Sequence, residues 1–237
     1  MKCAEKEVAG APPFEPESPF VIVCEGWQDA SFVCALLERL GVTNCDVTYP
    51  KKTDGGNGKD AIKKMVLLLA GRKPVLSGLA VIADADSTPE DSFKGICESF
   101  SAPYKPPPNC FEMHEHKETR TAIFLIPGRN KTGALEHLFL DAIQAVNPDG
   151  LRCVDALREC AQVTREWSEN KIGKMRLAAY VATNCKNDPC CSPAYLWSSK
   201  NMVFEISNPV FKELSDFLEA FTAEVPINPN KHADRPM

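Results

Sequence analysis

The sequence lacks a long apolar run and an excess of positive charge. No stretch approaches the roughly 20 consecutive apolar residues of a membrane helix, and residues 1–7 lack the apolar segment of a secretory signal. We therefore expect no membrane partner and a cytoplasmic location. The formal net charge of −5 argues against strong nonspecific binding of nucleic acid by the whole surface, because that attraction grows with the number of phosphates neutralised. A local basic patch is still compatible with this charge.

The sequence also lacks the paired Cys-x-x-Cys spacing of most zinc sites, although it contains 11 cysteines. Several of them lie in apolar segments, where a reduced thiol behaves as a small hydrophobic residue: Cys24, Cys34, Cys97 and Cys160. We predict that most cysteines are reduced core residues. One cluster leaves a structural zinc or an adventitious disulfide open as alternatives: Cys185, Cys190 and Cys191.

Proline and charge divide the chain into four parts. Four prolines among charged and small residues predict a disordered tail over residues 1–19, and a second proline-rich tail covers 226–237. Between them, residues 20–150 alternate apolar strand patterns with helical patterns, whereas residues 151–225 contain helical patterns only. This organisation predicts an α/β domain followed by a helical extension that packs on the sheet or forms a small cap.

The α/β part predicts a mainly parallel sheet of four strands flanked by helices, because strands that alternate with helices are joined by right-handed crossovers. The expected strands are 20–24, 45–49, 79–83 and 121–126. The expected helices are 29–40, 60–70, one that begins with Thr88 and Pro89, and 133–146, followed by 154–167, 171–183 and 209–221 in the extension.

Four acidic residues follow two of these strands. Glu25 and Asp29 come after residues 20–24, and Asp84 and Asp86 come after residues 79–83. Ligand sites in open α/β sheets form at the carboxyl ends of the strands, and residues two apart in extended backbone project to the same side. We therefore expect these carboxylates to converge. Asp29 alone also fits a carboxylate that stabilises a helix N-terminus.

Clustered carboxylates favour a hard cation, so we predict bound Mg²⁺ or Mn²⁺. Glu136, in the first turn of the helix after the fourth strand, could complete a second metal site or only stabilise its own helix. Lys59 is a candidate phosphate contact or catalytic lysine, against a plain flexible turn over residues 54–59. Arg129 and Lys131 are the other candidates, against solvated surface charges.

The order Glu25-Gly26-x-x-Asp29, then Asp84-x-Asp86, on alternating strands and helices resembles the Toprim domain of topoisomerases, primases and OLD-family nucleases. The resemblance covers residues 20–146 and extends to an uncharacterised Toprim-related family of small stand-alone proteins. It implies a Toprim-like Rossmannoid fold, acid/base chemistry or metal binding by Glu25, and Mg²⁺ binding by Asp84 and Asp86.

Together these features predict a metal-dependent nuclease that processes a phosphodiester of nucleic acid, with Glu25, Lys59 and Lys131 as catalytic residues. The metal would be held by Glu25, Asp29, Asp84, Asp86 and Glu136. The alternative is a non-catalytic Toprim-fold module that senses a nucleotide or binds a protein partner or a second copy of the chain. The acidic overall charge favours that alternative.

Overall fold

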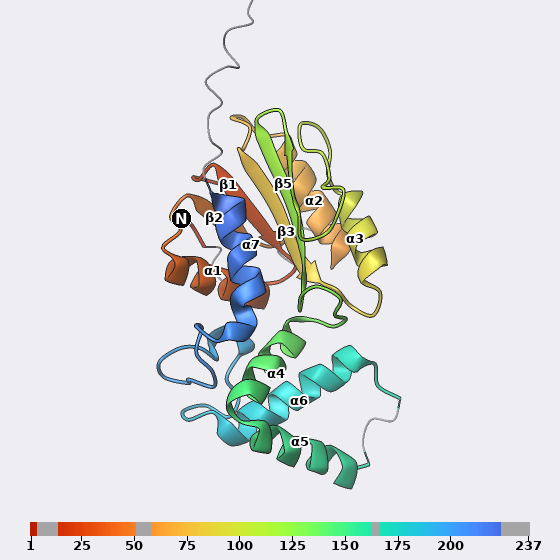
Figure 1. The fold of residues 1–237 in the computed structure, drawn as a ribbon, viewed down its shortest axis with the longest axis vertical. Helices are drawn as coiled ribbons and strands as arrows, with labels where there is room; N and C mark the ends of the chain where they lie inside the picture. Colours follow the sequence, from red (N-terminus) through yellow and green to blue (C-terminus); the bar gives the residue numbers. More distant parts are fainter. Residues whose placement is uncertain (4–13, 51–57, 163–165, 224–237) are drawn as a thin grey trace, which may run out of the picture.

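The computed structural model describes residues 1–3, 14–50, 58–162 and 166–223. Five strands form one sheet in the order β2-β1-β3-β5-β4 (Figure 1). They are β1 (Phe20–Cys24), β2 (Cys45–Thr48), β3 (Gly78–Asp84), β4 (Met113–His116) and β5 (Thr119–Ile126). All neighbouring strands are parallel except β4 and β5. The predicted α/β class and mainly parallel sheet are confirmed.

The count of four strands is wrong, because β4 adds an antiparallel edge strand. Its sequence, Met-His-Glu-His, has only partly buried and exposed side chains, whereas every residue of β5 is buried. An edge strand with no apolar face gives no hydrophobic periodicity from which to predict it. Within β4 only Met113 packs, partly buried, against the hydrophobic core.

Seven α-helices are present among the described residues. They are α1 (Trp27–Leu40), α2 (Lys59–Ala70), α3 (Pro89–Cys97), α4 (Leu135–Val146), α5 (Pro148–Cys160), α6 (Glu169–Asn184) and α7 (Lys212–Thr222), with short 3-10 turns η2 (Pro193–Tyr195) and η3 (Pro209–Phe211). Within the described chain, none of the helices has the length and apolar composition to cross a membrane.

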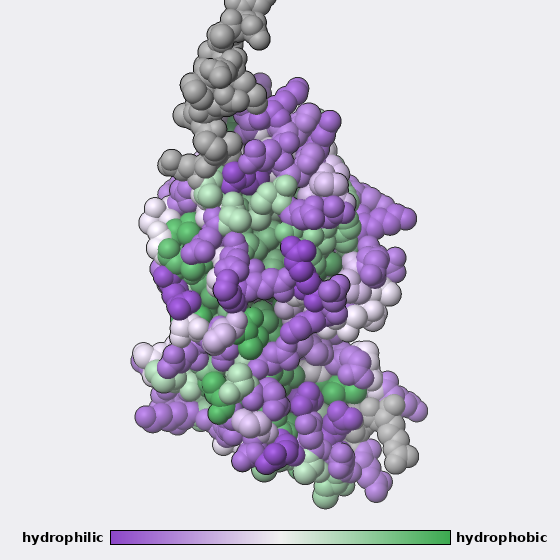
Figure 2. All heavy atoms as spheres, in the orientation of Figure 1, coloured by the Kyte–Doolittle hydropathy of each residue, from purple (hydrophilic) through white to green (hydrophobic). Residues whose placement is uncertain are grey.

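The strands of the sheet alternate their side chains between two hydrophobic clusters. Ile22 and Cys24 face the cluster that includes α1, α4 and α7, whereas Val21 and Val23 face the cluster that includes α2 and α3. Burial of both faces explains why these strands are continuous apolar runs. On the face drawn in Figure 2, hydrophilic residues predominate and hydrophobic residues occur in several separate groups.

The helical extension begins earlier than predicted, and its helices divide between the sheet and the region beyond the sheet edge. Its first helix, α5, begins at Pro148, which is six residues before the predicted start and ahead of the predicted domain boundary at residue 150. The helix begins there because the Asn147 side chain accepts a hydrogen bond from the Gly150 N–H and Pro148 takes the first helical position. Only α7 packs on the sheet; α5 and α6 pack on α4, beyond the carboxyl edge of the sheet (Figure 1). The extension therefore covers the edge where a site was predicted.

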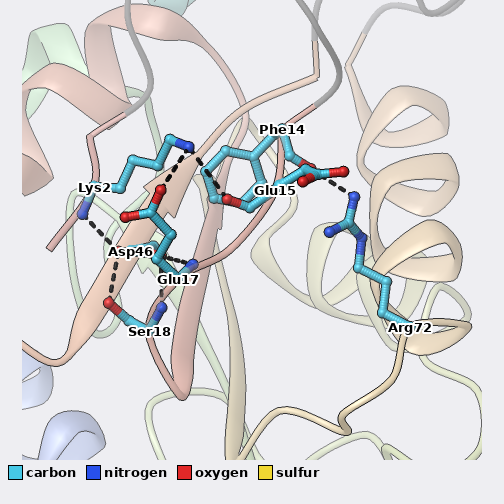
Figure 3. Close-up of polar contacts among 7 residues, drawn as sticks. All are labelled: Lys2, Phe14, Glu15, Glu17, Ser18, Asp46 and Arg72. Carbon is cyan, nitrogen blue, oxygen red and sulfur yellow. Dashed lines mark hydrogen bonds and ion pairs between the residues drawn. The ribbon is translucent and has the colours of Figure 1, made fainter.

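The N-terminal segment, predicted as a tail, makes specific contacts in its described residues. The Asp46 carboxylate on β2 accepts hydrogen bonds from the backbone N–H groups of Lys2, Glu17 and Ser18 and from the Ser18 hydroxyl (Figure 3). Burial opposes ionisation of Asp46, but these four hydrogen bonds outweigh it and lower its pKa. Residues 1–3 and 14–18 are thereby attached to the edge of the sheet. The predicted tail over 226–237 lies outside the described residues.

The cysteines depart from the prediction at several positions. Cys34 is bonded to Cys3 in a disulfide rather than reduced, and Cys160 is exposed, whereas Cys24 is a buried thiol as predicted. In the predicted cluster, the Asn201 side chain lies between two thiols: it accepts from the Cys185 Sγ at 3.6 Å and donates to the Cys191 Sγ at 3.0 Å. Cys190 is exposed.

Candidate acidic active site

Two acidic residues meet where neighbouring parallel strands end. Cys24 of β1 lies opposite Ile82 of β3, so Glu25 and Asp84 leave the sheet side by side. The Glu25 N–H donates to the Ile82 carbonyl at 3.1 Å, and Glu25 Oε2 accepts from the Asp84 N–H at 3.3 Å. The register of the sheet therefore turns the Glu25 side chain toward β3, as the sequence pattern predicts.

Asp29 joins them from the first turn of α1. Its Oδ2 accepts from the Gly26 N–H at 3.0 Å, which closes the turn between β1 and α1. Gly26 has an extended backbone that any residue could adopt. The absence of a side chain matters there, because a Cβ would lie only 3.1 Å from Asp29 Oδ2. Asp29 is only 9% exposed. It is therefore a cap of its own helix and also a buried charge beside Glu25.

The start of α4 supplies the fourth carboxylate. Asp84 Oδ1 accepts from the Leu135 N–H at 3.1 Å, and Glu136 follows in the same helical turn with a side chain 13% exposed. The four carboxylates line one open pocket of about 240 Å³. Its described lining residues are Glu25, Gly26, Gln28, Asp29, Gly58, Asp84, Leu135, Glu136 and Lys174. Strand ends, two helix starts and the helical extension thus build a single acidic pocket.

Burial and repulsion from neighbouring carboxylates disfavour ionisation of Glu25, Asp29 and Asp84. Burial, followed by the charges of Glu25 and Glu136, raises the pKa of Asp29 to about 7. Burial, followed by the charges of Asp29, Glu25 and Glu136, raises the pKa of Asp84 well above its ordinary value. Burial also raises the pKa of Glu25, with a further contribution from Asp86. A cation in the pocket would relieve the repulsion that keeps these carboxyls protonated.

Asp86 is positioned differently from the prediction. The backbone leaves the strand after Asp84 and is left-handed at Asp86, with φ 56°, so the expected extended geometry is wrong there. The Asp86 carboxylate pairs with Lys59 Nζ at 3.4 Å and accepts from Asn170 Nδ2 at 3.0 Å. The described pocket lining does not include Asp86. Asp86 thus links α2 and α6 beside the pocket.

The predicted cationic residues fall in different places. Lys59 lies close to the pocket, because its Nζ donates to Ser92 Oγ at 2.8 Å in addition to its Asp86 contact. Lys131 pairs with Asp141 at 2.7 Å, and Arg129 pairs with Glu213 at 3.2 Å. Neither belongs to the described pocket lining. Residues 54–57 of the predicted phosphate-contacting loop lie outside the described residues.

One pocket residue on α6 and one residue beside the pocket were missed. Lys174 lines the pocket with its Nζ 3.9 Å from Glu136 Oε1, and Asn170 contacts Asp86. They lie more than 80 residues beyond Asp84 and have no motif around them, so only the tertiary fold brings them here. Gly173 between them offered one signal, since a glycine inside a helix usually has a packing reason.

The donor chemistry of the pocket fits a hard divalent cation. Glu25, Asp29 and Asp84 each use a carboxylate oxygen to accept a backbone N–H, and all potential ligands are oxygens. No group of three or more His, Cys, Asp or Glu side chains is arranged as a preformed metal cage within the described ranges. Mg²⁺ does not require one, because it keeps several waters and binds through one or two carboxylates.

These features define an α/β protein with an acidic pocket at the carboxyl edge of a mainly parallel sheet, covered by a helical extension. The chain belongs to the DUF3226 family, described as a protein of unknown function, whose model matches residues 19–223. The family match therefore includes the helical extension as well as the sheet. No curated protein and no solved structure matches the chain.

Proposed function

We propose that this protein is a Toprim-related, metal-dependent enzyme that processes a phosphodiester, and specifically a nuclease acting on nucleic acid. The observation that carries the proposal is the pocket in which carboxylates from two parallel strand ends and two helix starts converge. Buried like charges are costly to retain unless a cation compensates them. A polyanionic substrate would need the same compensation, so metal binding and phosphodiester binding are coupled at this site.

Glu25 and Asp84 would hold Mg²⁺ or Mn²⁺, with Asp29 and Glu136 adding negative charge around it. When bound, the metal would neutralise charge on the phosphoryl oxygens and lower the pKa of a bound water. Glu25, whose pKa is raised by burial, is suited to accept a proton from the attacking water. Lys59, held beside the pocket by Asp86 and Ser92, is placed to contact a phosphate.

A non-catalytic module that senses a nucleotide is the second candidate. It is favoured by the net charge of −5 and by the modest volume of the pocket, about 240 Å³, which lies below the usual range of about 300–1,000 Å³ for drug-sized ligands. Such a module would bind a cation and a small phosphate ligand without cleaving a chain.

Cleavage of labelled single- and double-stranded DNA and RNA with Mg²⁺ or Mn²⁺ tests the proposal. Glu25→Gln and Asp84→Asn should each reduce the cleavage rate by at least about 100-fold, because the site works by electrostatic positioning. Glu159→Gln is the matched control, since Glu159 is an exposed carboxylate on α5. Circular dichroism and melting without metal establish that each variant is folded.

The outcomes separate the two candidates. Equal cleavage by wild type and Asp84→Asn would refute this active site. Absence of cleavage of all four nucleic acids, with Mn²⁺ still raising the melting temperature of the wild type but not of Asp84→Asn, would favour the sensing module.

A further inference from the structure

Helix α6 brings one lysine to the acidic pocket and one asparagine to Asp86 beside it. Asn170 and Lys174 are four residues apart and therefore lie on one face of the helix. Asn170 Nδ2 donates to Asp86 Oδ1 at 3.0 Å, and Lys174 Nζ lies 3.9 Å from Glu136 Oε1. The same face of α6 thus contacts residues that follow β3 and residues that begin α4.

Close packing of α6 on α4 depends on two glycines. The His137 ring lies between them: a Cβ at Gly133 would be 2.6 Å from His137 Nδ1, and a Cβ at Gly173 would be 2.7 Å from His137 Cε1. The Ala134 N–H donates to His137 Nδ1 at 3.1 Å, which fixes the ring. A glycine inside a helix is less favourable than alanine, so Gly173 is best explained by this close approach. It sets how far Lys174 stands from the pocket.

Lys174 itself contributes little to folding through its ion pair. Its side chain is 61% exposed, whereas Glu136 is 13% exposed, and a solvent-exposed pair at 3.9 Å is weakened by water. Its ammonium group carries three donors at the mouth of the pocket. Lys59, by comparison, already contacts Asp86 and Ser92. Lys174 is therefore the pocket lysine best placed to meet an incoming anion.

We propose that Lys174 is the substrate-binding residue of the helical extension and contacts a backbone phosphate of the nucleic acid at the mouth of the acidic pocket. The inference rests on the proposed function and adds a substrate-contacting residue to it. An ammonium group is a point charge that recognises a phosphate without reading a base, so this contact is independent of sequence. Asn170 and Gly173 are positioning residues that hold α6 in place for it.

The test measures binding without cleavage. Fluorescein-labelled 20-nucleotide DNA, single-stranded and duplex, is titrated with protein in Ca²⁺ at 50–200 mM salt and followed by fluorescence anisotropy. Lys174→Gln should weaken binding by about five- to tenfold at the lowest salt and reduce the salt slope by about 0.7–0.9, the loss of one phosphate contact. Lys174→Arg should retain most of the affinity.

Lys171→Gln is the matched control, because Lys171 is an exposed lysine one turn earlier on α6. It should change the affinity by less than about twofold, as expected for a charge outside the contact. Mn²⁺ titration calorimetry gives a readout free of nucleic acid. Lys174→Gln should bind Mn²⁺ as tightly as wild type or up to about fivefold more tightly, because a cation competing for the carboxylates has been removed.

Two results would overturn the assignment of Lys174 while the proposed function stands. The first is DNA binding by Lys174→Gln equal to that of Lys171→Gln. The second is loss of Mn²⁺ binding in Lys174→Gln, which would mean that the lysine only maintains the pocket. Failure of wild type to bind either DNA or the corresponding single-stranded and duplex RNAs in the same titration, with Mn²⁺ binding intact, would instead refute the proposed function and this inference together.

Discussion

Replacing Asp29 with asparagine should stabilise the metal-free protein at neutral and alkaline pH. The Asp29 carboxyl is 9% exposed, and burial and the charges of Glu25 and Glu136 raise its pKa to about 7. The folded state therefore holds a proton that the unfolded state releases near pH 4. The contribution of this group to stability is complete below the ordinary pKa and is lost as pH rises through about 7.

The size of the effect follows from proton linkage. One proton bound by the folded state and not by the unfolded state gives a slope of at most about 1.4 kcal/mol per pH unit. Between the ordinary value of 3.8 and about 7, the loss for Asp29 amounts to at most about 4 kcal/mol. Asparagine keeps the side-chain oxygen that accepts from the Gly26 N–H, so the turn before α1 should survive the substitution.

Urea unfolding in EDTA at several values between pH 4 and pH 8 measures the difference directly. The stability of Asp29→Asn relative to wild type should increase up to about pH 7 and then level off. Asp91→Asn is the matched control, because Asp91 occupies the corresponding third position of α3 but is exposed. A constant difference between Asp29→Asn and wild type across this pH range would show that Asp29 is not a buried, repelled carboxyl and would remove the electrostatic basis of the metal proposal.

Two further predictions concern the parts that hold the extension and the N-terminus. Arg120 is 5% exposed and donates to the Ala220, Phe221 and Ala223 carbonyls at the end of α7. Arg120→Met should therefore lower the free energy of unfolding by about 3 kcal/mol. A loss below about 1 kcal/mol in urea unfolding would contradict this role. Cys3→Ser should lower the free energy of unfolding by about 2–4 kcal/mol without reductant, because the disulfide joins residues separated by 31 positions in the sequence. A difference of the same size in dithiothreitol would exclude the disulfide as the cause.

The sheet was predictable where burial dictates the sequence. Strands β1 and β3 are apolar on both faces, so their patterns persist without any knowledge of their neighbours. Strand β4 and the start of α5 were not predicted, for different reasons. The first has no apolar face, whereas the second carried a readable signal, since Asn147 followed by Pro148 is a common way to begin a helix.

The acidic site was predictable to the extent that it depends on strand ends. Glu25 follows β1 and Asp84 ends the neighbouring parallel strand β3, and the register, in which Cys24 lies opposite Ile82, brings them close together. Asp86 was not predictable from the two-residue period of a strand, because the strand ends at Asp84 and Asp86 is left-handed. Aspartate tolerates the left-handed conformation better than most residues, so the sequence is compatible with such a turn but does not predict it.

The cationic side of the site depends on tertiary packing. Lys174 reaches the pocket because α6 approaches α4 across Gly173 and His137, a contact between segments that are distant in sequence. The carboxylates lie where a parallel sheet always presents its strand ends, whereas the lysine on α6 requires the extension to fold over that edge. If the α6 contact is essential, the sheet domain without the extension would keep the acidic residues and Lys59 but would lack the lysine that lines the pocket. The match of the family model through residue 223 agrees with one functional unit that includes both parts.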